Sequence, residues 1–171
     1  GDIISGDCGV LCNVGYGDSS YPFPGGVIKE EIKRLLDYTR ASLEEGVMEA
    51  VDGKRVGDIS NAVQTKAESG GYSVVRDLVG HGLGRKLHEQ PEVANWGKQG
   101  TGPKMEKGLV ICIEPMINTG KKETLQMRDG WTIKTADGKP SAHFEYAVAV
   151  DKGRADVLTT FEFIEKVLNK M

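Results

Sequence analysis

The feature that most constrains the fold is an apolar run, Leu109-Val110-Ile111-Cys112-Ile113, that ends at Glu114. A run without polar alternation predicts a strand buried on both of its faces. Such a strand must lie inside a sheet that other elements cover. Glu114 follows at the rim of this buried strand, where a carboxylate is costly unless it is paired or binds a cation.

Periodicity in the rest of the chain predicts an α+β fold. Alternating runs at 2–12 and 15–23 predict an antiparallel hairpin, with Asn13-Val14-Gly15 as its turn. Apolar residues at helical spacing predict helices over 27–51 and 56–69, the second ending at Gly70-Gly71. Strands are expected at 72–75, 131–135 and 157–160, and a long strand at 142–150. A loop is expected at 93–107 and a last helix over 161–169. No repeat or linker divides the chain, so we expect one domain over residues 1–171.

Composition excludes several classes of protein. The net charge is −3 with no basic block, which argues against nucleic acid as a partner. No apolar run approaches the ~20 residues of a membrane span. Cys8, Cys12 and Cys112 are odd in number and lack CxxC spacing, so we expect reduced, buried thiols in a cytoplasmic protein. The chain opens at Gly1 with a strand-like segment, and we expect that its natural beginning is missing.

Two of the three histidines lie in the Gly-rich stretch Gly80-His81-Gly82-Leu83-Gly84-Arg85-Lys86-Leu87-His88-Glu89-Gln90-Pro91. Three glycines around His81 predict a loop whose backbone adopts positive φ and comes close to a bound group. Pro91 fixes the exit from this loop. The alternative is an ordinary surface loop with a hydrogen-bonded core histidine. Functional residues are common on loops, which favours a site.

Four acidic residues lie where acids are unusual. Asp7 and Asp18 are on the two arms of the predicted hairpin, roughly opposite one another, and Glu145 lies within an apolar strand. Like charges facing each other destabilise a sheet, so a cation is expected between them. For any single acid, a salt bridge or solvent exposure explains its presence equally well. All four together with His81 favour a metal site for Mn, Fe, Co or Zn, with enough negative charge for two divalent ions.

Taken in order and spacing, these segments resemble type I methionine aminopeptidases. The matching segments are Asp7-Cys8-Gly9, Tyr16-Gly17-Asp18-Ser19, Gly80 to Pro91, Ile113-Glu114-Pro115-Met116, Asp129-Gly130-Trp131-Thr132 and Phe144-Glu145. The resemblance implies the pita-bread (creatinase/aminopeptidase-like) fold, a curved, mostly antiparallel sheet backed by helices. It also implies cytoplasmic removal of the initiator methionine from peptides and nascent polypeptides, with the ribosome as a candidate partner.

Carried over by position, the resemblance implies a set of five ligands for two divalent ions. Asp7 would chelate one ion, Asp18 and Glu145 would bridge both, and His81 and Glu114 would complete the other. Glu114 would also be the general base or proton shuttle for the water that attacks the methionyl carbonyl.

Three further residues receive roles from the resemblance. His88 would touch the scissile amide and steady the tetrahedral intermediate. Trp131 would line the methionine pocket, although an ordinary core aromatic is the alternative. His143 is expected to orient a ligand or support the structure rather than to bind metal itself.

The chain also departs from the family pattern. The family domain has a further N-terminal portion that carries another active-site histidine. Gly6, Leu78 and Tyr146-Ala147 replace the usual residues at their positions. Two alternatives therefore stay open: another pita-bread peptidase that cleaves Xaa-Pro bonds, such as an aminopeptidase P or a prolidase, and a truncated, non-catalytic binding protein. Retention of all five ligands argues against the second, and metal binding is better supported than full activity.

Overall fold

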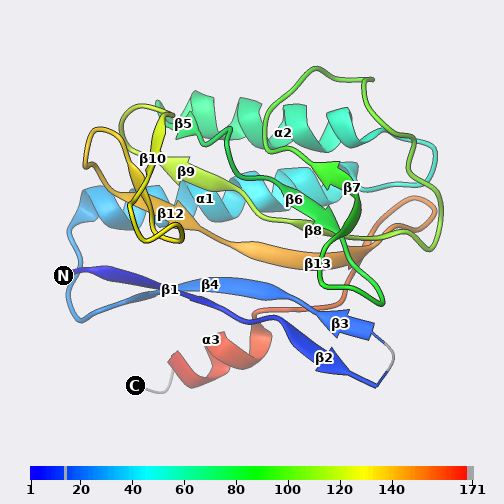
Figure 1. Ribbon diagram of the computed structural model, residues 1–171, viewed down its shortest axis with the longest axis horizontal. Coiled ribbons are helices and arrows are strands. Elements are labelled where there is room, and N and C mark those ends of the chain that lie inside the picture. The colour runs from blue at the N-terminus through cyan, green and yellow to red at the C-terminus, as the bar shows by residue number, and fades with distance from the viewer. Residues whose placement is uncertain (14, 169–171) are drawn as a thin grey trace.

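The computed structural model describes residues 1–13 and 15–168, and its centre is a curved antiparallel sheet (Figure 1). Neighbouring strands follow the order β1-β4-β13-β8-β6-β7, and β14 pairs with β13. The bounds of these strands are β1 Ile3–Asp7, β4 Ser19–Pro24, β6 Gly80–Gly82, β7 Glu89–Val93, β8 Val110–Ile113, β13 Glu145–Ala149 and β14 Asp156–Val157.

Shorter strands extend this arrangement. The hairpin predicted at the N-terminus is confirmed: β1 pairs with β4, and β2 (Val10–Cys12) pairs with β3 (Gly15–Gly17) farther along. Asn13 adopts a φ of 54°, while Val14 of the expected turn lies outside the described residues. A three-stranded sheet has the order β12-β9-β5, and a separate hairpin joins β10 to β11. Their bounds are β5 Ser73–Val74, β9 Met116–Asn118, β10 Thr124–Gln126, β11 Ile133–Thr135 and β12 Ser141–His143.

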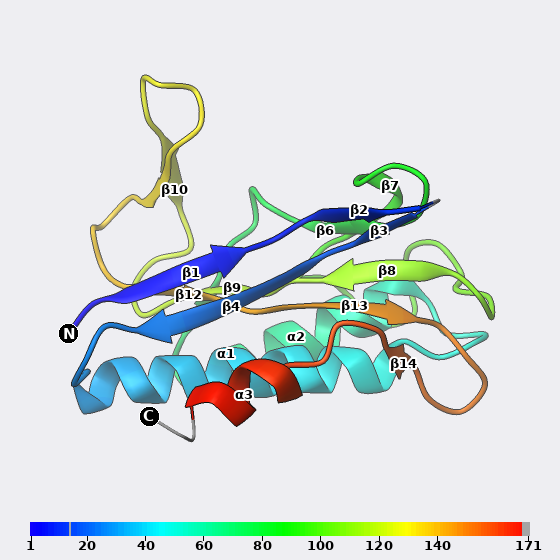
Figure 2. The same cartoon turned by 90° about the horizontal axis from the view of Figure 1, so that it is seen from below.

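Two long helices cover one face of the large sheet (Figure 2). Helix α2 (Val56–Ser69) has the predicted bounds, and it ends where Gly71 takes a φ of 83°. Helix α1 (Glu30–Glu49) begins three residues later than predicted because Lys29 is an extended N-cap. The expected last helix is α3 (Glu162–Leu168), with Asn169 outside the described residues. None of the described helices combines the length and the hydropathy that crossing a bilayer requires.

The main core lies between these helices and the sheet. Leu43, Ile59 and Val63 from the helices pack with Ile111 and Ile113 of β8. Because side chains alternate along a strand, Cys112 points to the other face, where it packs with Leu83 and Ala147. Ile111, Cys112 and Ile113 are all fully buried, which confirms the prediction of a strand covered on both faces.

The Gly-rich stretch is not the loop that its glycines suggest, because Gly80–Gly82 forms β6 and pairs with β7. Gly80, Gly82 and Gly84 have no positive φ. Their importance is steric instead. A Cβ on Gly80 would lie 2.3 Å from the carbonyl oxygen of Cys112, and one on Gly82 would lie 2.2 Å from that of Gln90. These glycines therefore let the neighbouring backbones approach His81 from both sides.

Other expectations also need correction. The strand predicted over 142–150 is interrupted at Phe144, which separates β12 from β13 and places them in different sheets. The strand expected over 131–135 is shorter and pairs locally with β10. Cys8 and Cys12 are exposed rather than buried, and only Cys112 fits the predicted buried thiol.

Candidate metal centre

A cavity of about 460 Å³ opens on the sheet face away from the helices and gathers six of the seven predicted site residues. These six are Asp7, Asp18, His81, His88, Glu114 and Glu145. Leu78, Leu87 and Met116 add apolar surface to its wall, and His143 lies beside the acids. Residues that are distant in the sequence therefore converge on one hollow.

Strand pairing explains how the acids meet. Asp7 pairs with Ser20 across β1 and β4, and Glu145 pairs with the same Ser20 across β4 and β13. Asp18 lies two residues before Ser20, in the gap between β3 and β4. It is therefore diagonal to Asp7, not opposite it as predicted. The diagonal spacing leaves more room between the two carboxylates than a direct pair would.

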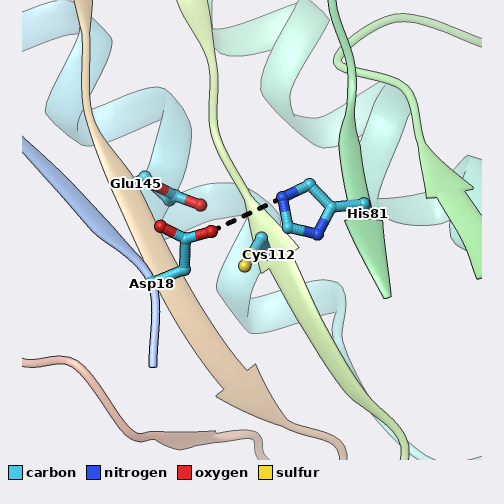
Figure 3. A group of neighbouring side chains, drawn as sticks. All are labelled: Asp18, His81, Cys112 and Glu145. Atoms are coloured by element: carbon cyan, nitrogen blue, oxygen red, sulfur yellow. Dashed lines mark ion pairs between the residues drawn. The ribbon is translucent and has the colours of Figure 1, made fainter. Parts of the chain in front are cut away.

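Four buried side chains lie closest together. Ligand atoms of Asp18, His81, Cys112 and Glu145 all lie within 4.8 Å of one another, and Figure 3 shows them on four neighbouring segments. Cys112 was not among the residues predicted from the sequence. The signal that could have found it is its position two residues before Glu114, which directly follows β8, because alternate residues of an extended segment share a face.

His81 presents a bare nitrogen to the acids. Its Nδ1 lies 3.0 Å from the carbonyl oxygen of Gly82, which can only accept a hydrogen bond, so Nδ1 carries the proton. In the neutral ring Nε2 is then an acceptor. It faces Asp18 Oδ2 at 3.7 Å and Glu114 Oε1 at 3.6 Å. Acceptors facing one another across such distances fit a bound cation, and imidazole with carboxylates suits a borderline divalent ion.

Burial and mutual repulsion raise the pKa values of two carboxyl groups of the site, those of Glu145 and Asp18. Burial, with Glu114 and Asp18 nearby, raises the pKa of Glu145 to about 9. Burial, followed by the charge of Asp7, also raises the pKa of Asp18. Among the described residues, Asp18 and Glu114 pair with histidines, and no lysine or arginine forms an ion pair with an acid of the site. A cation would therefore replace the proton that Glu145 otherwise holds at neutral pH.

The thiol of Cys112 stays neutral in this setting, since burial and the nearby Glu145 raise its pKa. Asn95 supports the position of Glu114, because its Nδ2 donates a hydrogen bond to the backbone carbonyl of Glu114 at 3.1 Å. No pattern in the sequence predicts a role for Asn95.

His88 and Trp131 differ in where the structure places them. His88 is exposed between β6 and β7, and its ring centroid is 4.3 Å from that of His81. It therefore reaches the cavity from the solvent side. Trp131 is 89% exposed and lies at the end of the β10–β11 hairpin, which projects from the body of the molecule (Figure 2). The structure does not bring Trp131 to the cavity.

Comparison with known proteins gives a consistent family. The chain is 48% identical over 159 residues to methionine aminopeptidase of Clostridium perfringens, a match that covers 93% of this chain and 64% of the relative. The crystal structure of methionine aminopeptidase from Rickettsia prowazekii superposes with a TM-score of 0.91 at 38% identity, covering 94% of this chain and 65% of that one. The chain thus spans somewhat under two thirds of the length of these relatives.

A more distant likeness is informative about the fold alone. Prolidase from Pyrococcus furiosus superposes with a TM-score of 0.74 at 21% identity, over 95% of this chain and 42% of that one. The pita-bread fold expected from the sequence is confirmed by these superpositions. The model of metallopeptidase family M24 matches residues 1–152. Because this match covers most of the chain and the relatives reach 48% identity, the chain belongs to metallopeptidase family M24.

Proposed function

We propose that the chain removes the N-terminal methionine from peptides and nascent proteins with the help of two divalent metal ions. The observation that carries the proposal is the convergence of His81 and four carboxylates in one cavity with apolar walls. Relatives named methionine aminopeptidase, at up to 48% identity, support the substrate.

Five residues would hold the ions. The donors would be the carboxylates of Asp7, Asp18, Glu114 and Glu145 and the imidazole of His81. When bound, the ions supply Lewis acidity and a water activated for attack at neutral pH. Co, Mn, Fe and Zn all suit this donor set, and the identity and number of the ions stay predictions.

Side chains of the cavity also have proposed roles in proton transfer and in substrate binding. The carboxylate of Glu114 can accept a proton from the attacking water and return it to the leaving amine. His88 lies at the solvent side of the cavity, where an imidazole N–H can hold the carbonyl oxygen of the scissile amide. Leu78, Leu87 and Met116 supply an apolar wall that suits an unbranched apolar side chain. Trp131 in the methionine pocket stays a prediction.

Two other functions compete with this one. Cleavage of Xaa-Pro bonds is compatible with the fold, but the likeness to prolidase is limited to the fold. A binding protein without catalysis has no chemical need for four acids in one cavity, where burial raises the pKa of Glu145. A cytoplasmic location and contact with the ribosome remain predictions that fractionation and ribosome co-sedimentation would test.

Hydrolysis assays with matched peptides test the substrate. The chain is stripped of metal, reloaded with Mn²⁺ or Co²⁺, and given Met-Ala-Ser or an Xaa-Pro peptide. We expect metal-dependent release of methionine, its loss in Glu114→Ala, and its retention in Glu106→Ala, which changes an exposed glutamate that does not line the cavity. Cleavage of the Xaa-Pro peptide alone would overturn the substrate assignment. Metal binding without turnover of either peptide would favour the binding protein.

A further inference from the structure

The third histidine, His143, has a geometry that the proposed function leaves unused. It ends β12, and its Nδ1 lies 3.2 Å from the hydroxyl oxygen of Ser20 on β4. Its Nε2 lies 3.5 Å from Oε2 of Glu114. Within the part of the chain that the structure describes, this buried nitrogen has no hydrogen-bond partner. His143 thus lies between a fully buried hydroxyl and a predicted ligand.

Glu114 has one imidazole on each side. His81 Nε2 faces Oε1 at 3.6 Å, and His143 Nε2 faces Oε2 at 3.5 Å. The two rings differ in what holds their other nitrogen. His81 Nδ1 faces a carbonyl and must donate. His143 Nδ1 faces a hydroxyl, which can rotate to donate or accept.

The hydroxyl of Ser20 is compatible with either tautomer of His143, so the group beside Nε2 sets the preference. An ionised carboxylate offers only acceptors, so a bare Nε2 beside Oε2 would set two lone pairs against each other. With the proton on Nε2, the ring is attracted to Glu114, and Nδ1 becomes the acceptor for the hydroxyl of Ser20. The hydroxyl of Ser20 can rotate to donate to Nδ1, because the described residues give its Oγ no other hydrogen-bond partner. With this tautomer, His143 would carry its proton on the opposite nitrogen from His81, whose Nδ1 must donate.

We propose that Ser20, His143 and Glu114 form a relay in which Ser20 fixes the ring of His143 and His143 donates its Nε2–H toward Oε2 of Glu114. His143 is then a positioning residue and not a metal ligand. His143 holds Oε2 of Glu114 and leaves Oε1 of the same carboxylate free on the side of His81. The inference rests on the proposed metal centre and adds the residue that fixes one of its ligands. Partners that orient ligands in this way change metal affinity about 10- to 100-fold.

Substitutions that keep or remove the donor test the relay. His143→Gln retains an N–H donor, whereas His143→Leu removes it at comparable size. We expect His143→Leu to weaken Co²⁺ and Mn²⁺ binding about 10- to 100-fold in calorimetric titrations and to alter the visible spectrum of bound Co²⁺. His143→Gln should stay near the unaltered chain, and Ser20→Ala should fall between them. Ser141→Ala on the same strand is the matched control: it removes a hydrogen bond to the carbonyl oxygen of Ile117 and should leave metal binding unchanged.

Specific results would overturn the relay. Equal losses in His143→Gln and His143→Leu, with one fewer ion bound, would make His143 a ligand. Unchanged binding in His143→Leu would remove it from the site. Nitrogen-15 NMR of the unaltered chain avoids any folding defect of the variants, and we expect the proton on Nε2; a proton on Nδ1 refutes the relay. If the unaltered chain binds no ions, the proposed function fails, while the NMR result still decides the relay.

Discussion

Glu145→Gln should change how the stability of the metal-free chain depends on pH. Burial, with Glu114 and Asp18 nearby, raises the pKa of Glu145 from 4.5 to about 9. The folded chain therefore keeps a proton that the unfolded chain releases above pH 4.5. This contribution to stability is complete at low pH and is lost as pH rises toward 9. Between pH 6 and pH 8 the loss amounts to about 3 kcal/mol. Glutamine cannot ionise and removes it.

Urea denaturation in the presence of a chelator measures the effect. The free energy of unfolding is compared at pH 6 and pH 8 for the unaltered chain, for Glu145→Gln, and for Glu162→Gln. Glu162 is exposed, so its variant should follow the unaltered chain. Asp18 is present in all three proteins, so the difference measures Glu145 together with its repulsion of Asp18. The reasoning is wrong if Glu145→Gln loses as much stability between the two pH values as the unaltered chain does.

Three further predictions concern metal, packing and the exposed hairpin. Divalent metal at 100 times its dissociation constant should raise the free energy of unfolding by about 3 kcal/mol, which urea denaturation with and without metal measures. Metal affinity should rise with pH, since bound metal displaces a proton. Titration calorimetry in two buffers measures that proton release, and binding without it would contradict the prediction. Gly80→Ala should destabilise the fold by about 3 kcal/mol, because its Cβ would lie 2.3 Å from a backbone oxygen, whereas Gly17→Ala has open space and should be tolerated; thermal unfolding compares them. Trp131→Ala should change stability by less than about 0.5 kcal/mol, since its side chain is 89% exposed, and a larger shift in the melting temperature would show hidden packing.

Local signals were enough to predict much of the fold. The bounds of α2 follow from apolar spacing and two terminal glycines, and β8 follows from an apolar run without alternation. The hairpin at the N-terminus was predicted from two alternating segments around a short turn. In each case the information lies within a few neighbouring residues. Such local patterns are the ones that a sequence reveals most directly.

Features that depend on long-range pairing were missed. Gly80 and Gly82 belong to a strand only because β7 and β8 lie against them, and their lack of side chains is a requirement of those neighbours. The diagonal placement of Asp18 depends on a register set by the whole hairpin. Ser20 looks unremarkable in the sequence, and Cys112 is marked only by its position two residues before Glu114. They approach the acids only after four strands are aligned.

The sheet separates what stabilises the fold from what binds metal. Ile111 and Ile113 of β8 face the helices and join the large apolar core, while Cys112 between them faces the acids. Glu145 and Ala147 share that second face, where apolar packing is limited to a small cluster. Because burial of apolar surface is the main stabilising term, the helix side can support carboxylates whose repulsion destabilises the other side. Substitutions of the site acids should therefore alter metal binding and the pH dependence of stability. The slope of the free energy of unfolding against denaturant concentration should stay that of the unaltered chain.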